Sequence, residues 1–261
     1  MHKQLKRVTD YDKRLPIVEI YTAVQSEGSR AGYPTVVIRT TGCTHRCYFG
    51  EGGWCDSWYT SIHAEKGKYS FNDIIQAYKD NPHITEMMLT GGSPTMHSAL
   101  VNELTHFAHE NEIFITIETE GSHFLPTDYP INLLSISPKF SNSVPVVGVL
   151  TPQGDVTTEK MVKTHNRLRC NWDAIKQSIA YHSDFHLKPV WDGEDQEALK
   201  EIMDAIAALD ISPEKVWFMP AGDTREALQI SYPKMFDWVR DNGYRLTWRP
   251  HIIAFQDKRE V

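Results

Sequence analysis

Short apolar, β-branched runs alternate along this chain with amphipathic stretches, and this alternation limits the possible folds more than any other feature. Each short run between turn residues predicts a strand, and each stretch with apolar residues at helical spacing predicts a helix. The expected strands are 35–40, 86–90, 113–118, 133–137, 185–190, 216–219 and a last one that begins at Leu246. The expected helices are one capped by Ser70 with Asp73 three residues on, one with the face Leu100, Leu104 and Phe107, and one with the face Leu199, Ile202, Met203 and Ile206.

Dense strand–helix alternation predicts parallel strands covered by helices. In a barrel of that kind the reactive residues lie at the carboxyl ends of the strands. The notable motifs of this chain fall at such ends, namely Cys43, Gly91-Gly92, Glu118, 137–139 and Met219-Pro220. We therefore expect an α/β fold with one functional site at the carboxyl edge, and a loop excursion over 141–160, where Pro, Gly, Ser and Thr are frequent.

Charge and hydropathy exclude several function classes. The net charge of −7 over 261 residues argues against a general nucleic-acid binder, because phosphate neutralisation needs a surplus of Lys and Arg. The longest apolar run, 144–150, is far shorter than the roughly 18 residues that span a membrane. The polar N-terminal segment does not resemble a secretory signal, so a cytoplasmic location is expected.

Three of the four cysteines, Cys43, Cys47 and Cys55, fall within thirteen residues, which points to metal or redox chemistry. Three thiolates can hold three irons of a four-iron cluster and leave the fourth iron open to a small molecule. A structural zinc site closes all four positions, and here His45 or Cys170 would have to supply the fourth ligand. Zinc stays open as an alternative; otherwise Cys170 is expected to be a small buried hydrophobe.

The cysteine loop resembles that of the radical S-adenosylmethionine superfamily, whose pattern is C-x3-C-x-aromatic-C. The first gap matches, and Trp54 supplies the aromatic residue before Cys55, but seven residues instead of two separate Cys47 from Cys55. Gly50, Gly52 and Gly53 lie in this insertion, and we expect them to let the loop bulge outward without moving the thiols.

A second segment, 90–94 with the sequence TGGSP, resembles the superfamily's Gly-Gly-Glu-Pro motif, which binds the methionyl amine of the cofactor. Ser93 stands in place of the usual Glu, so the resemblance implies contacts from its hydroxyl and from backbone carbonyls.

Further stretches resemble the 7-carboxy-7-deazaguanine synthase family within that superfamily. They are 24–28 (VQSEG) with 32–34 and Ile38-Arg39, then 54–57 (WCDS), then 117–121 (IETEG) with 135–139 (SISPK), and, less specifically, 186–188, 219–220 and 249–251. The likeness covers most of the chain and is strongest over 18–139. It implies a partial or modified TIM-type (β/α)6 barrel of the radical SAM kind, forming a single domain over 1–261.

The resemblance also implies the site. The [4Fe–4S] cluster ligands would be Cys43, Cys47 and Cys55, and the Mg²⁺ ligand Ser57. The residues for S-adenosylmethionine would be Trp54, Gly91, Gly92, Ser93, Glu118, Ser137 and Lys139. The residues for the pterin substrate would be Gln25, Glu27, Arg39, Thr90 and His251. Without the resemblance, Gln25 and Glu27 would be surface loop residues and Arg39 a structural ion-pair partner.

The implied reaction converts 6-carboxy-5,6,7,8-tetrahydropterin to 7-carboxy-7-deazaguanine with loss of ammonia, in queuosine or other deazaguanine biosynthesis. A flavodoxin or ferredoxin would be the reductant, and the family resemblance suggests a homodimer. Two other functions stay open: an activase that makes a glycyl radical on a partner protein, and a zinc-stabilised binding module.

Overall fold

A six-stranded sheet carries the fold in this computed structural model, which describes residues 5–50, 53–256 and 258–261. Its strand order is β1-β2-β3-β4-β5-β6; β1 runs antiparallel to β2, and every other neighbouring pair is parallel. The carboxyl ends of five strands therefore meet at one edge. The strands are β1 (Ile17–Val24), β2 (Pro34–Thr40), β3 (Glu86–Gly91), β4 (Phe114–Thr119), β5 (Leu133–Ile136) and β6 (Phe185–Leu187).

A second, parallel sheet continues the first. It contains β7 (Val190–Trp191), β8 (Trp217–Pro220) and β9 (Arg245–Leu246). Leu187 forms a parallel bridge with Val216, and three residues further along both strands Val190 pairs with Met219. The strands β6 and β7 therefore follow one path along β8, with a break at Lys188-Pro189. Pro189 has no N–H to donate to a ladder. The expected strand 185–190 is therefore divided in two.

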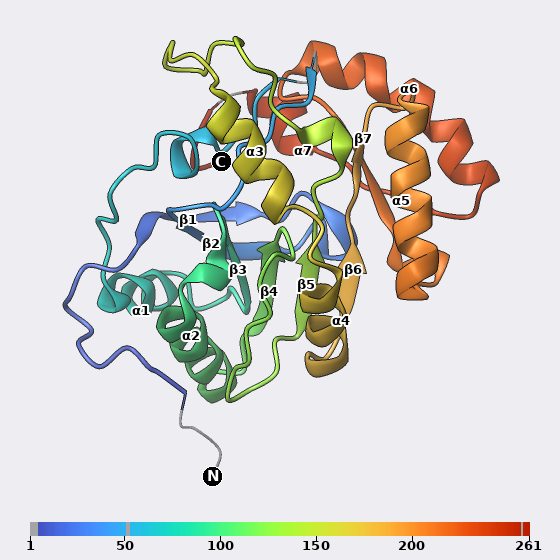
Figure 1. Ribbon diagram of the computed structural model, residues 1–261. Helices are drawn as coiled ribbons and strands as arrows, with labels where there is room; N and C mark the ends of the chain where they lie inside the picture. Colours follow the sequence, from blue (N-terminus) through green and yellow to red (C-terminus); the bar gives the residue numbers. More distant parts are fainter. Residues whose placement is uncertain (1–4, 51–52, 257) are drawn as a thin grey trace.

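Helices cover the sheets and close the hydrophobic core between them. Figure 1 shows α1, α2 and α4 against the six-stranded sheet, and α5 and α6 beside the second sheet. Large fully buried core side chains include Phe71 from α1, Leu104 from α2 and Ile117 from β4. The helices are α1 (Phe71–Asp80), α2 (Ser98–Glu110), α3 (Glu159–Leu168), α4 (Trp172–Tyr181), α5 (Gln196–Leu209), α6 (Arg225–Asp241) and α7 (Pro250–Phe255).

The predicted α/β class with parallel strands is confirmed, as a partial barrel. No ladder joins β1 to β9 among the described residues, so the sheet stays open. The pattern did not predict β1, α3, α4, α6 or α7. The excursion at 141–160 is largely irregular, with a short 3-10 turn at Ser141–Ser143. The single domain over 1–261 stays a prediction. Within the described ranges, no helix is both long and apolar enough to cross a membrane.

The expected cap at Ser70 is present as a full capping box: the Ser70 hydroxyl accepts from the Asp73 N–H, and the Asp73 carboxylate accepts from the Ser70 N–H. We expect Ser70→Ala to lower the free energy of unfolding by about 1 kcal/mol, because it leaves a helix N-terminal donor unsatisfied. The melting temperature should fall by about 2–4 °C in calorimetry. Ser70→Thr, which keeps the acceptor, is the matched control; an equal loss in both variants would contradict the cap.

Candidate functional site

A cavity of about 460 Å³ lies at the carboxyl edge of the strands, and its wall contains fourteen of the sixteen predicted site residues. This volume lies in the range of about 300–1,000 Å³ that is usual for small-molecule sites. The fourteen are Glu27, Arg39, Cys43, Cys47, Trp54, Cys55, Ser57, Thr90, Gly91, Gly92, Glu118, Ser137, Lys139 and His251. The wall excludes Gln25 and Ser93.

Seven residues lie between Cys47 and Cys55, five more than in the superfamily pattern, and the described ones pair as in a hairpin. Tyr48 and Trp54 form an antiparallel bridge, their rings lie 5.0 Å apart, and the Cys55 N–H donates to the Cys47 carbonyl at 3.1 Å. This contact keeps the two cysteines side by side whatever the length of the hairpin. The backbone torsions φ of Gly50 and Gly53 are positive, as the expected bulge requires. Gly52, named in the same prediction, lies outside the described residues.

The three thiols share the cavity wall, and the fourth cysteine lies elsewhere. Burial raises the pKa of Cys43 to about 12 and that of Cys55 to about 11, and it holds the pKa of Cys47 well above its usual range. Binding of a metal would have to displace these protons. Cys170 contacts the Lys139 carbonyl at 3.1 Å instead. In the described part of the chain, no three His, Cys, Asp or Glu side chains are grouped closely enough to hold a single metal ion.

The Gly91-Gly92 turn is held against the start of the cysteine loop. The Gly92 N–H donates to the Thr40 carbonyl at 3.1 Å, and the Ser93 N–H donates to the Gly42 carbonyl at 2.7 Å. A Cβ atom at Gly91 would lie 2.3 Å from the Thr40 oxygen, and the φ of +123° at Gly91 also favours glycine. The two glycines therefore allow β3 to approach the residues that lead into Cys43.

Buried charges join three strand ends on the other side of the cavity. Lys188, directly after β6, donates to Glu27 at 2.5 Å and to Glu118 at 2.6 Å, and its side chain is only 4% exposed. Glu118 also accepts from the Thr90 hydroxyl at 2.8 Å. Burial disfavours ionisation of Glu27, but Lys188 and Arg249 more than offset this and hold the pKa of Glu27 well below its ordinary value. Glu27 is therefore a carboxylate at neutral pH.

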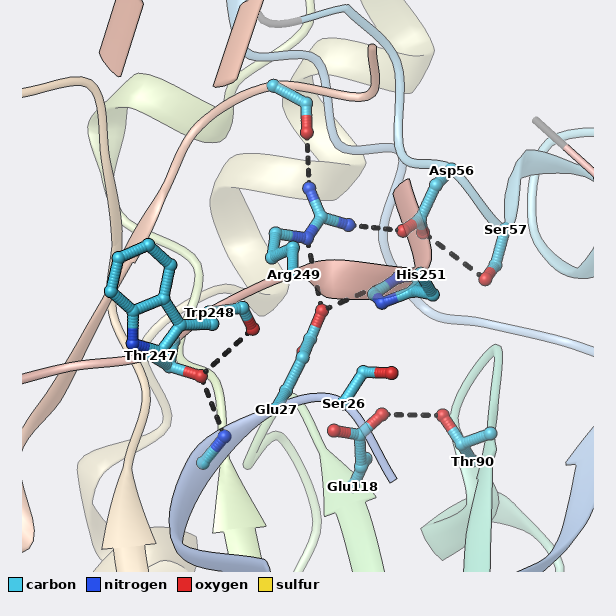
Figure 2. A network of polar contacts seen from close by, with 12 residues as sticks. Ser26, Glu27, Asp56, Ser57, Thr90, Glu118, Thr247, Trp248, Arg249 and His251 are labelled. Carbon is cyan, nitrogen blue, oxygen red and sulfur yellow. Dashed lines mark hydrogen bonds and ion pairs between the residues drawn. The ribbon is translucent and has the colours of Figure 1, made fainter. Parts of the chain in front are cut away.

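Arg249 extends this network to the cysteine loop. Its guanidinium donates to Glu27 at 3.0 Å and to Asp56 at 2.5 Å, and also to the Gly222 carbonyl. Figure 2 shows Arg249 between the two carboxylates, with His251 next to Glu27 and Ser57 next to Asp56. Burial lowers the pKa of His251, so its ring is neutral at pH 7. A continuous ionic path thus runs from β4 to the residue after Cys55.

Arg39 is engaged by side chains of its own chain. It donates to Glu19 at 2.6 Å, to the Ser57 hydroxyl at 2.8 Å and to the Tyr21 hydroxyl at 3.1 Å. Glu19 also accepts from Arg259 at 2.5 Å, which brings the C-terminal segment to the mouth of the cavity. Arg39 is therefore an ion-pair partner here, the role expected of it without the resemblance, and three of its five N–H groups are already used.

Gln25 and Ser93 are buried and do not line the cavity wall, and their roles in the site stay predictions. Gln25 is 2% exposed, and its backbone pairs with Tyr33 and Gly32. Ser93 is fully buried and donates to Glu120 at 2.6 Å; Glu120 itself lies in the wall.

Sequence reasoning missed five residues of the site. Lys188, Arg249 and Asp56 lie inside segments that carried the resemblance, but no role was assigned to them. Glu120 directly follows β4, and its place at a strand end was the signal available. Glu19 lies within β1, which was not predicted. The missed residues are Glu19, Asp56, Glu120, Lys188 and Arg249.

The comparisons with known proteins identify the family of this chain. No family model matches the sequence. A 7-carboxy-7-deazaguanine synthase from Halobacterium salinarum is 33% identical over 95% of this chain and 93% of its own length. One from Rhodopirellula baltica is 28% identical over 95% of this chain and 89% of its own. The fold is similar to that of QueE from Escherichia coli, with a TM-score of 0.57 and 18% identity over 89% of this chain and 92% of that one. The chain therefore belongs to the 7-carboxy-7-deazaguanine synthase family.

Proposed function

We propose that this chain converts 6-carboxy-5,6,7,8-tetrahydropterin to 7-carboxy-7-deazaguanine as a radical S-adenosylmethionine enzyme. Membership of the family supports the reaction. The observation that carries the proposal for this chain is that three thiols and a buried network of carboxylates and cations line one cavity. A glycyl-radical activase would need the cysteines and the Gly-Gly turn but not this charged network.

The cavity wall fits the two cofactors. Cys43, Cys47 and Cys55 would hold the [4Fe–4S] cluster, and the adjacent Gly91-Gly92 turn and Glu118 would receive S-adenosylmethionine. When bound, these groups supply the radical chemistry; the protein supplies position and exclusion of water. Trp54 donates to the Leu150 carbonyl at 2.9 Å and so ties the cysteine loop to the 141–160 excursion.

The charged network would hold the substrate. Glu27 accepts from Lys188 through one oxygen and from Arg249 through the other, and a carboxylate has about four lone-pair sites, so Glu27 can still accept from the guanidine-like edge of a pterin. Lys188 and Arg249 hold this carboxylate in place. Arg39 has two N–H groups left for a substrate carboxylate.

Mg²⁺ would bind together with the substrate. Ser57 supplies one hydroxyl and Asp56 one neighbouring carboxylate, and Mg²⁺ commonly takes its other ligands from substrate and water. Because Arg39 donates to the Ser57 hydroxyl at 2.8 Å, this bond must be released when the ion binds. A flavodoxin or ferredoxin would supply the electron, and two copies of the chain would form a homodimer.

The first test is anaerobic reconstitution with iron and sulfide, followed by turnover with S-adenosylmethionine, Mg²⁺, dithionite and carboxytetrahydropterin. We expect mass spectrometry to detect 5′-deoxyadenosine and 7-carboxy-7-deazaguanine. Cys43→Ala, Cys47→Ala and Cys55→Ala should each lose most of the bound iron and all turnover, whereas Cys170→Ala should keep both. Tightly bound zinc without iron, or loss of iron in Cys170→Ala alone, would contradict the cluster assignment.

We expect Glu27→Gln to raise the KM for the pterin by about 10- to 100-fold, because a hydrogen bond to a charged group contributes about 1.5–3 kcal/mol. The exchange is isosteric and leaves Lys188 paired with Glu118, and Arg249 with Asp56. Formation of 5′-deoxyadenosine without pterin should be unchanged. The matched control is Glu159→Gln on the exposed face of α3; equal KM values in both variants would exclude Glu27 from the substrate site.

Ser57→Ala should abolish most of the stimulation of turnover by Mg²⁺, since it removes the only hydroxyl proposed as ligand. Ser61→Ala is the matched control, because Ser61 lines the same cavity but bonds the Trp58 carbonyl. Titration of Mg²⁺ against the rate in the three proteins measures the effect. Retained stimulation in Ser57→Ala would exclude this residue as the ligand.

A further inference from the structure

Glu120 is a carboxylate whose two oxygens have different surroundings. One oxygen, Oε1, accepts from the hydroxyls of Ser93 at 2.6 Å and Thr44 at 3.3 Å, and also from that of Ser122. The other, Oε2, is buried and has no hydrogen-bond partner in the described part of the chain. The residue is 6% exposed and lies in the cavity wall with Cys43 and Cys47.

Burial of a carboxylate is costly unless a cation or further donors satisfy it. Among the described residues, no Lys, Arg or His forms an ion pair with Glu120. Lys139 lines the same cavity, but it donates to Ser137 at 2.8 Å. Three hydroxyls therefore fix the orientation of Glu120, while its second oxygen is left for a cation that the chain does not provide. A ligand ammonium group in the cavity fits this arrangement.

The position of Glu120 indicates which ligand carries that ammonium. Glu120 bonds Thr44, the residue after Cys43, whereas Glu27, the carboxylate proposed for the pterin, bonds Lys188 and Arg249. Ser93 occupies the place where the superfamily motif has a carboxylate, and its hydroxyl donates to Glu120. The carboxylate that is absent from the turn after β3 is thus present at the end of the neighbouring strand β4.

We propose that Glu120, oriented by Ser93, accepts the ammonium group of the methionyl part of S-adenosylmethionine. This inference rests on the proposed function, because it requires that cofactor. Ser93 is then a positioning residue: its hydroxyl orients the Glu120 carboxylate and does not contact the ligand.

Binding can be measured without turnover. Equilibrium dialysis of the reconstituted, unreduced holoenzyme would use two probes: S-adenosylmethionine and 5′-methylthioadenosine, which lacks the amino-acid part. We expect Glu120→Gln to weaken binding of S-adenosylmethionine by about 10- to 100-fold, the effect of losing a hydrogen bond between charged groups. Binding of 5′-methylthioadenosine should be unchanged. Glu110→Gln, on the exposed end of α2, is the matched control.

A second variant tests the exchange of positions. Adding Ser93→Glu to Glu120→Gln returns a carboxylate to the turn and should restore much of the lost affinity. Iron and sulfide analysis checks that each protein carries its cluster. If Glu120→Gln lacks the cluster, Ser93→Ala takes its place in the comparison. We expect Ser93→Ala to bind S-adenosylmethionine more weakly and 5′-methylthioadenosine as tightly as the wild type.

Three results separate the inference from the function on which it rests. Equal affinity of wild type and Glu120→Gln for S-adenosylmethionine would overturn the role of Glu120 and leave the proposed function intact. An equal loss for both probes would also overturn it, because Glu120 would then shape the pocket as a whole. Failure of the wild-type holoenzyme to bind S-adenosylmethionine would instead contradict the proposed function.

Discussion

The position of Lys188 between Glu27 and Glu118 is the interaction on which the rest of the site depends. A lysine that is 4% exposed is stable only when it is paired, and its two partners come from the loop after β1 and from β4. Arg249 shares Glu27 and reaches Asp56, next to Cys55. The cost of burying these charges therefore ties the loop after β1, the strands β4 and β6, and the cysteine loop into one geometry.

The cavity has two chemically different ends because of this ionic path. Around Cys43 and Cys47 lie several hydroxyls, the ring of His45, whose pKa burial lowers to about 3, and the carboxylate of Glu120, which forms no ion pair among the described residues. Around Glu27 the groups are charged and paired. Glu118 lies between the two ends, since it accepts from both Lys188 and Thr90.

The sequence predicted those parts of the fold that follow from local periodicity. The strands 35–40 and 86–90 were apolar runs, and the motifs at their ends lie in the cavity wall. By contrast, β1 was missed because the fully buried Glu19 interrupts its apolar run, and what makes Glu19 acceptable there is its position opposite Arg39 in the register with β2. Pro233 similarly breaks the pattern of α6. Pairings such as Lys188 with Glu27 join residues 161 positions apart and depend on the tertiary fold.

The departures from the superfamily pattern are concentrated around the cysteine loop, and they support one another there. The hairpin between Cys47 and Cys55 is held by the excursion, since the Tyr48 N–H donates to the Ser143 carbonyl at 3.0 Å and Trp54 bonds Leu150. Helix α3 follows the excursion, and its buried His165 accepts from the Arg46 N–H at 3.1 Å. The hairpin needs such support, because an isolated two-stranded hairpin is at best marginally stable in water. The described part of the insertion and the excursion therefore support each other beside Cys47 and Cys55.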